Sequence, residues 1–248
     1  MKAAITAPLS SVLMAVMALL APAGVEARAG DARASEAAVD RATQAALALD
    51  AHPDRGASQF ARYCARCHGS RAQGNAGRDA GRAIPVLAAQ RFAYLVRQLA
   101  NFAGGERDSD AMHRVASQKE LQAPQSWVDI AAYLNRARLS VRAQTGDGAR
   151  LAAGRSIFRA QCATCHSGDA HGDEDGFVPS LRNQHYPYLV DQLHKLAEGY
   201  RHNADESLVR FLGGFDDQDL RATADYLSRL HGPGAVHKVM RNDGVVVH

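Results

Sequence analysis

The feature that most constrains this sequence is a repeat built around its cysteines. The segment CARCH at 64–68 returns as CATCH at 162–166, and IPVLAAQRFAYLVRQL at 84–99 returns as VPSLRNQHYPYLVDQL at 178–193. Self-similarity of this kind predicts that one folding unit has been duplicated. The glycines and polar residues of 141–150 indicate the linker between the two copies.

All four cysteines of the chain belong to the two short motifs. In C-x-x-C-H, two cysteines can form thioether bonds to the vinyl groups of one porphyrin, and the histidine that follows can bind its iron. The sequence therefore predicts two covalently bound haem c groups. The residues expected to hold them are Cys64, Cys67, His68, Cys162, Cys165 and His166.

Other uses of paired cysteines fit this pattern less well. The pairs of a four-cysteine zinc ribbon lie roughly 15–20 residues apart, whereas Cys67 and Cys162 are far more distant. A thioredoxin-type pair needs a βαβ pattern, and no strand-like run surrounds either motif. Two structural disulfides stay open as an alternative, although a bridge from Cys64 to Cys67 would close a small, strained ring.

The N-terminus predicts export from the cytoplasm. Residues 1–27 combine an early lysine, an apolar stretch and small residues near Val25 and Ala27, which is typical of a cleaved signal peptide. A retained membrane anchor is the alternative, because the apolar stretch is nearly long enough to span a bilayer. Either way we expect a periplasmic protein, because haem is attached covalently on that side of the membrane; a retained anchor would make it membrane-associated.

The charge balance excludes one class of partner. The formal net charge of +3 is small, and nothing in the sequence has the basic patches of a nucleic-acid-binding protein. A mild charge asymmetry can still steer docking to a partner protein.

Each copy is expected to form short helices joined by loops. The stretches at 55–64 and 154–162 lead into the cysteine motifs as first helices, and apolar residues at helical spacing follow in 92–102. Pro124 is predicted near the start of the last helix of the first copy, and Asp216 as the N-cap of its counterpart. The alanine-rich stretch 35–50 is expected to be a helix that forms a solvated or loosely packed arm.

With these motifs in view, residues 55–231 resemble the periplasmic dihaem cytochromes c of the cytochrome c4 type. The resemblance depends on CARCHG and CATCHSG, the P-x-L-x-x-Q segments at Pro85 and Pro179, the Y-L-x-x-Q-L helices, and the turns FAGGERD and LAEGYRH. It implies an all-α fold of two tandem class I cytochrome c-like domains, each wrapped around one haem. The expected segments are a signal peptide (1–27), a helical arm (28–53), domain 1 (54–140), a linker (141–148), domain 2 (149–231) and a tail (232–248).

The resemblance also implies roles for residues outside the cysteine motifs. A proline carbonyl would accept a hydrogen bond from the free ring nitrogen of each iron-binding histidine, so Pro85 would orient His68 and Pro179 would orient His166. A methionine would bind the first iron from the other side. Met112, the only methionine in the duplicated region, is the expected ligand, with its neighbour His113 as the competitor.

The second copy departs from that pattern because it has no methionine at the matching place. Counting back from the last helix gives Leu208, and counting forward by the upstream offset gives Glu206. Three explanations stay open: a histidine of the second copy such as His202 binds the iron, the tail supplies His237 or Met240, or the iron is open to water or a small ligand. Cysteine ligation is excluded, because both pairs are used.

The expected function is single-electron transfer between redox partner proteins, without catalytic residues. The resemblance implies a respiratory complex or a dehydrogenase as electron donor and a haem–copper terminal oxidase as acceptor, with membrane contact only through partners or an uncleaved leader. One alternative is a haem enzyme or small-ligand binder, for instance peroxidase-like, at the second iron. Another is an electron-transfer subunit of a larger oxidoreductase. Unequal iron ligands would also give the two haems unequal reduction potentials.

Overall fold

The protein folds entirely into helices and loops over the residues that its structure, a computed structural model, describes: 23–77, 83–138 and 142–231. The only β-type pairing among them is two isolated bridges, Asn75 with Ile84 and Asp173 with Val178. Asp173 follows Asn75 by 98 residues, and Val178 follows Ile84 by 94 residues, so the two bridges occupy matching points of the two copies. The predicted all-α fold is confirmed.

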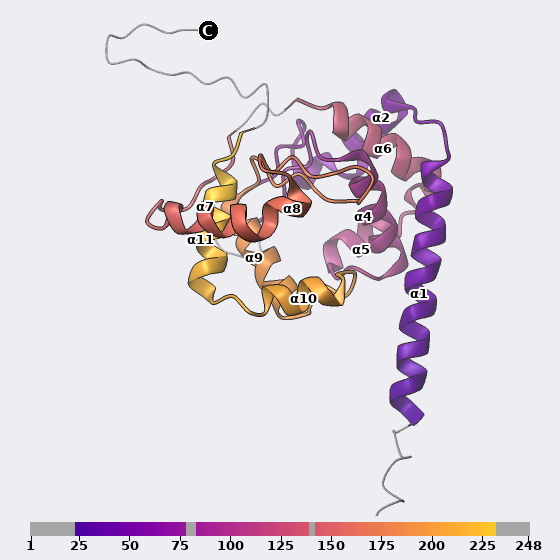
Figure 1. Cartoon of the computed structure of the whole chain (residues 1–248). Coiled ribbons are helices and arrows are strands. Elements are labelled where there is room, and N and C mark those ends of the chain that lie inside the picture. The colour runs from indigo at the N-terminus through magenta and orange to yellow at the C-terminus, as the bar shows by residue number, and fades with distance from the viewer. Residues whose placement is uncertain (1–22, 78–82, 139–141, 232–248) are drawn as a thin grey trace, which may run out of the picture.

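The helices form two sets that follow one another along the chain (Figure 1). The first set comprises α1 (Ala23–Leu47), α2 (Pro53–Tyr63), α3 (Ala65–His68), α4 (Phe92–Gly104), α5 (Asp110–Ala116), the 3₁₀ turn η1 (Lys119–Leu121) and α6 (Pro124–Arg136). The second set comprises α7 (Leu151–Ile157), the π-helical turn η2 (Phe158–Cys162), α8 (Ala163–His166), α9 (Tyr186–Ala197), α10 (Glu206–Leu212) and α11 (Asp217–Ser228).

In each set the helix that leads into the cysteine motif, α2 or α7, crosses the last helix, α6 or α11, at very short range. We call it the first helix of its copy, because α1 precedes the repeat. A Cβ atom on Gly56 of α2 would lie 1.9 Å from the carbonyl oxygen of Asp129 in α6, and one on Gly154 of α7 would lie 2.0 Å from that of Ala222 in α11. Only glycine permits such contact between backbones. The crossing fixes where the following cysteine motif emerges, because that motif continues directly from the first helix.

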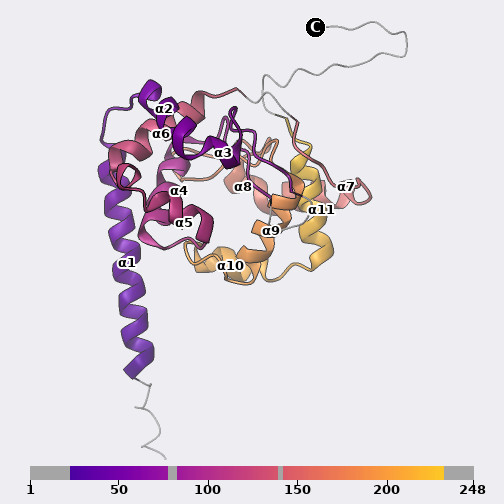
Figure 2. The same cartoon turned by 180° about the vertical axis from the view of Figure 1, so that it is seen from behind.

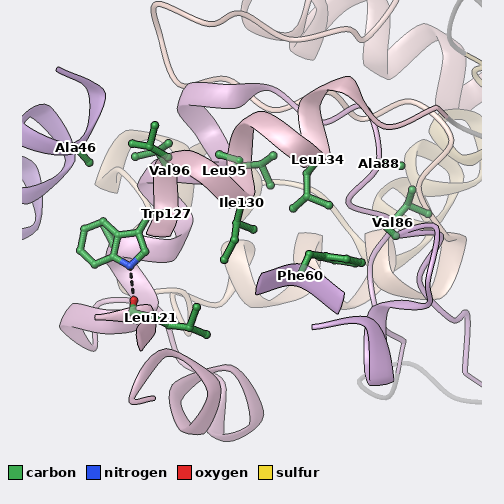
Figure 3. Close-up of a cluster of buried hydrophobic side chains, with 14 of the residues drawn as sticks. Ala46, Phe60, Val86, Ala88, Leu95, Val96, Leu121, Trp127, Ile130 and Leu134 are labelled. Atoms are coloured by element: carbon green, nitrogen blue, oxygen red, sulfur yellow. Dashed lines mark hydrogen bonds between the residues drawn. The ribbon is translucent and has the colours of Figure 1, made fainter. Parts of the chain in front are cut away.

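The apolar core of the first set lies between α2, α4 and α6 (Figure 3). Phe60, Ile130 and Leu134 are almost completely buried there. Trp127 is buried beside them, and its indole N–H donates to the carbonyl oxygen of Leu121 at 2.7 Å. A buried indole needs such a partner, so this bond ties η1 to α6.

Two of the predicted helix starts are confirmed. Pro124 occupies the first turn of α6, where its missing N–H costs nothing. Asp216 is the N-cap of α11, and its carboxylate accepts from the backbone N–H of Asp219 at 2.8 Å. These two starts set the last helix of each copy, on which the first helix packs.

Helix α1 corrects the expectation of a loosely packed arm. Val39 and Ala46 are buried in the core of the first set, and α1 contacts α4 and α6. Figures 1 and 2 show it along the edge of the molecule farthest from α7 and α11. Residues 1–22 and the tail 232–248, which include most of the expected leader, lie outside the described residues. No helix within the described ranges is long and apolar enough to span a bilayer.

The linker is fastened to the second set of helices. The backbone N–H groups of Gly146 and Gly148 donate to the carboxylate of Asp225 in α11, at 3.0 and 2.7 Å. The carbonyl oxygen of Gln144 accepts from the N–H of Tyr186 at the start of α9. These bonds order the glycine-containing linker and hold it against one copy.

Candidate haem sites

Each C-x-x-C-H motif ends in a single helical turn, α3 or α8. No disulfide joins the cysteines. Burial, with a smaller contribution from Cys67, raises the pKa of the Cys64 thiol to about 12, and burial with Cys165 raises that of Cys162 to about 11. A redox-active thiol pair needs a lowered pKa. The thioredoxin-type alternative is therefore disfavoured.

The two motif histidines make the same hydrogen bond. Nδ1 of His68 lies 3.2 Å from the carbonyl oxygen of Pro85, and Nδ1 of His166 lies 3.1 Å from that of Pro179. Because a carbonyl can only accept, Nδ1 carries the proton in each ring, which leaves Nε2 as the nitrogen that can bind iron. Burial lowers the pKa of both histidines and the carbonyls offset this only in part. Both rings are therefore held neutral, as metal ligands must be.

The N-caps of α5 and α10 show which residue of the second copy corresponds to Met112. Ser109 is the N-cap of α5, and Asp205 is the N-cap of α10. Met112 is the third residue after the first cap, and Leu208 is the third after the second. Leu208, and not Glu206, is thus the counterpart of Met112. Met112 is half-buried, whereas Leu208 is exposed.

Four histidines of the second copy that could replace the missing methionine contact other polar groups. Nε2 of His202 lies 3.3 Å from the carboxylate of Asp108 in the first copy, and its side chain is 64% exposed. Three further histidines of the second copy contact other polar groups: His171 with Asp169, His185 with Gln73 and Gln144, and His194 with Asp217. His237 and Met240 lie outside the described residues.

A cluster of two arginines, two tyrosines and two glutamines joins the copies, and its members are Tyr94, Gln98, Arg107, Tyr188, Gln192 and Arg201. The Arg107 guanidinium donates to the side-chain oxygens of Gln98 at 2.7 Å and of Gln192 at 2.9 Å, and to the Tyr188 hydroxyl at 2.9 Å. Arg201 makes the matching bond to the Tyr94 hydroxyl, at 3.3 Å. Burial alone would raise the pKa of Tyr94, but the two guanidinium groups outweigh it and the pKa is lowered.

This arginine cluster has no anionic partner within the described part of the chain: no carboxylate there pairs with Arg107 or Arg201. Arg107 is buried, and a buried cation is costly without an opposite charge. Haem carries two propionate carboxylates, a pair of vinyl groups and an iron. Guanidinium groups can bind the propionates, paired thiols can form bonds to the vinyl groups, and a neutral imidazole with a free Nε2 can bind the iron. The residues present therefore fit haem.

Comparisons with known proteins agree with the repeat. The family model described as cytochrome c matches residues 151–231, and that described as cytochrome c oxidase, cbb3-type, subunit III matches residues 51–134. The chain is 30% identical over 194 residues to the thiosulfate dehydrogenase electron acceptor of Stutzerimonas stutzeri, covering 75% of this chain and 88% of that protein. It is 27% identical over 187 residues to cytochrome c4 of Azotobacter vinelandii, covering 69% and 86%. The crystal structure of reduced cytochrome c4 from Pseudomonas stutzeri superposes with a TM-score of 0.63 and 25% identity, over 73% of this chain and all of that one.

The fold and the two sites define a c-type cytochrome with two haem domains in one chain. The repeated cysteine motifs, the matched histidine–proline bonds and the comparisons all lead to that class. The chain belongs to the family of dihaem cytochromes c of the cytochrome c4 type. Its cofactors are two covalently bound haem c groups, and it is an electron-transfer protein.

Several residues that join the copies were visible in the sequence only as repeated letters. Gln90 and Gln184, like the members of the arginine cluster, recur at an offset of 94. Identical polar residues at matching positions of a duplicated unit are the signal that could have marked them, because contacts across a twofold axis come in reciprocal pairs. Which residues of the other copy these side chains contact could not be predicted without the fold.

Proposed function

We propose that this cytochrome carries electrons one at a time, with one haem held in each copy of the repeat. Domain 1 would span 54–140, the linker 141–148 and domain 2 149–231. The first haem would be held by Cys64, Cys67 and His68, with Met112 as second iron ligand. The second would be held by Cys162, Cys165 and His166. The observation that carries this proposal is the matched pair of histidine–proline hydrogen bonds beside the two cysteine motifs.

The chain's own residues would tune and position the haems. When bound, haem supplies an iron that changes reversibly by one electron. The Pro85 and Pro179 carbonyls keep a proton on Nδ1 of each histidine, which makes the ligand more basic. The arginine cluster offers positive charge between the copies for the propionates. No acid–base or nucleophilic residue is needed.

The two haems would differ in reduction potential. A thioether from Met112 raises the potential of the first, because it favours reduced iron. Leu208 has no donor atom to do the same for the second. Electrons would therefore rest on the first haem and pass through the second at lower potential.

The relatives suggest partners on both sides of the transfer. One relative is named as the electron acceptor of thiosulfate dehydrogenase, and the first copy matches a subunit model of a cbb3-type oxidase. We propose a periplasmic dehydrogenase or a respiratory complex as donor and a haem–copper oxidase as acceptor. The matches to exported cytochromes and the leader-like residues 1–27 support a periplasmic location.

A second candidate function is supported by Leu208 alone. Without a ligand from this position, the second iron would be open to a neutral diatomic ligand such as carbon monoxide. The protein would then act as a ligand binder or a haem enzyme at that site. A distal acid–base group would be needed for enzymatic turnover, and the four histidines described above make their contacts elsewhere.

A redox titration followed by visible spectroscopy tests the main proposal. The protein should show two reversible one-electron steps at separate potentials. Replacing Met112 with alanine should lower only the higher potential and remove the methionine–iron charge-transfer band of the oxidised protein. A single step, or an unchanged spectrum in that variant, would overturn the assignment of the first site.

A further inference from the structure

The two P-x-L-x-x-Q segments, 85–90 and 179–184, bind each other across the domain boundary. The side chain of Gln90 reaches domain 2, where its Nε2 donates to the carbonyl oxygen of Ser180 at 2.9 Å and its Oε1 accepts from the Ser180 N–H at 2.7 Å. Gln184 reaches domain 1 and makes the same two bonds with Val86, both at 2.9 Å. Each amide thus pairs with both backbone groups of one residue, as a neighbouring strand would.

The two residues whose backbones bind these amides directly follow the prolines whose carbonyls accept from the motif histidines. Ser180 follows Pro179, whose carbonyl lies 3.1 Å from His166 Nδ1. Val86 follows Pro85, whose carbonyl lies 3.2 Å from His68 Nδ1. The Pro179 carbonyl and the Ser180 N–H belong to one peptide group, and so do the Pro85 carbonyl and the Val86 N–H. The same planar unit therefore makes the bond that orients the iron ligand and one of the two cross-domain bonds.

The glutamines are held rigidly in this position. The residues before them, Ala89 and Asn183, have φ angles of 58° and 48°, in the left-handed region, which alanine rarely adopts and asparagine adopts more readily. Both are anchored to the last helix region of their own domain, where Ala89 N–H donates to Leu134 at 2.9 Å and Asn183 N–H donates to Leu230 at 2.7 Å. Strained backbone that recurs at equivalent positions is retained where the surroundings fix it.

Burial makes these bonds consequential. Gln90 is 8% exposed and Gln184 is 6% exposed. Removing a buried amide leaves the backbone groups of its partner without a hydrogen bond, and buried backbone groups are seldom left in that state. The segment on the other side of the interface would then shift to find new partners, and the proline carbonyl would move with it.

We infer that Gln90 and Gln184 are positioning residues, each for the iron-binding histidine of the other domain. Gln90 in domain 1 sets the histidine–carbonyl bond of domain 2, and Gln184 in domain 2 sets that of domain 1. The haem of one domain is thereby tuned by how the other domain is docked. This inference rests on the proposed haem sites.

Replacing either glutamine with methionine keeps the side-chain length and removes the amide. A weakened bond to the proline carbonyl makes the histidine less basic and favours reduced iron. In Gln90→Met the reduction potential of the second haem should rise while that of the first is unchanged, and in Gln184→Met the pattern should be reversed. The potentials are assigned to domains beforehand with Met112→Ala, which alters the first haem only.

The matched control is Gln125→Met. Gln125 is a half-buried glutamine of α6 whose amide donates to the carbonyl oxygen of Asp50 in the arm and to the carboxylate of Asp129 in domain 1, and makes no bond to domain 2 among the described residues. It should move neither potential. A shift in the haem of the mutated domain itself, an equal shift in both, or no shift would each overturn the inference.

The wild-type protein offers a second, independent test if the variants fail to mature. Native-state hydrogen exchange should show the N–H groups of Val86 and Ser180 as strongly protected although they lie outside any helix; rapid exchange would overturn the inference. Full haem attachment and two reversible redox steps together with rapid exchange would leave the proposed function standing and remove only the cross-domain role.

Discussion

Leu208 occupies in α10 the place that Met112 occupies in α5: each is the third residue after a capping side chain. Both domains have a short helix with a side-chain cap here, but the second has no donor atom at this position. This difference predicts unequal haems.

Replacing Leu208 with methionine should therefore make the domains alike. In the wild-type protein reduced with dithionite, carbon monoxide should shift the visible spectrum of about half of the haem, because under the proposed assignment Met112 gives a thioether to the first iron and Leu208 gives none to the second. In Leu208→Met that fraction should fall towards zero, and the lower potential should rise. Phe211→Met, one turn further along α10, is the control and should leave both unchanged.

A wild-type protein that binds no carbon monoxide would mean that another group fills the site. Removing residues 232–248 would then separate the tail from the histidines. A gain of carbon monoxide binding on truncation would identify His237 or Met240 as the ligand.

The arginine cluster should control potential through charge. In Arg107→Met a buried positive charge is removed while the apolar stem is kept, so reduced haem is stabilised less and at least one potential should fall. The change should depend little on salt, because buried charges are poorly screened. The control is Arg150→Met, which removes an exposed guanidinium that contacts Gln218 and Asp219 in domain 2. Unchanged potentials in Arg107→Met would contradict the role of the cluster.

Asp129 gives domain 1 a predictable dependence on pH. Burial alone would raise the pKa of Asp129, but Arg55, the N–H of His52 and Gln125 stabilise its charge, and the pKa is lowered. The stabilisation is therefore complete above the ordinary carboxyl pKa of about 4 and is lost as pH falls through the lower value of the folded state. Asp129→Asn should cost about 1.5–3 kcal/mol at neutral pH, in line with hydrogen bonds to charged groups.

Denaturant unfolding at several pH values checks this. The difference between wild type and Asp129→Asn should shrink as the solution is made more acidic than about pH 4. A constant difference would show that the packing of Asp129, and not its charge, is what matters. Asp54→Asn, an exposed carboxylate on α2, controls for the general loss of a negative charge.

The close crossing of α2 and α6 should tolerate no added methyl group. In Gly56→Ala the new Cβ would meet backbone at 1.9 Å, so the helices must separate, at a cost of about 1–3 kcal/mol. Gly214→Ala is a suitable control because its nearest contact would be at 3.4 Å. Thermal unfolding of both variants measures the effect, and equal melting temperatures would refute a tight crossing.

The sequence predicted the local parts of this molecule well. The two cysteine motifs and the helix starts at Pro124 and Asp216 each depend on residues that are close together in the chain, and the repeat is visible by comparing the sequence with itself. The equivalence of Met112 and Leu208 was ambiguous by counting, because the segment between Arg201 and α10 differs in length from its counterpart. The capping residues resolve it.

Contacts between distant segments could not be predicted in the same way. The pairing of Gln90 with Ser180 joins residues 90 positions apart, and nothing in either segment states which domain face meets the other. The packing of α1 was missed for a similar reason, since an alanine-rich helix has little apolar periodicity to indicate a buried side. Both features depend on tertiary docking.

Mass spectrometry of the protein purified from a host with working haem-ligation machinery tests the central claim most directly. After proteolysis, one haem mass should be found on the peptide that contains Cys64, Cys67 and His68, and one on the peptide that contains Cys162, Cys165 and His166. Peptides of unmodified mass at either motif would contradict a haem in each copy of the repeat.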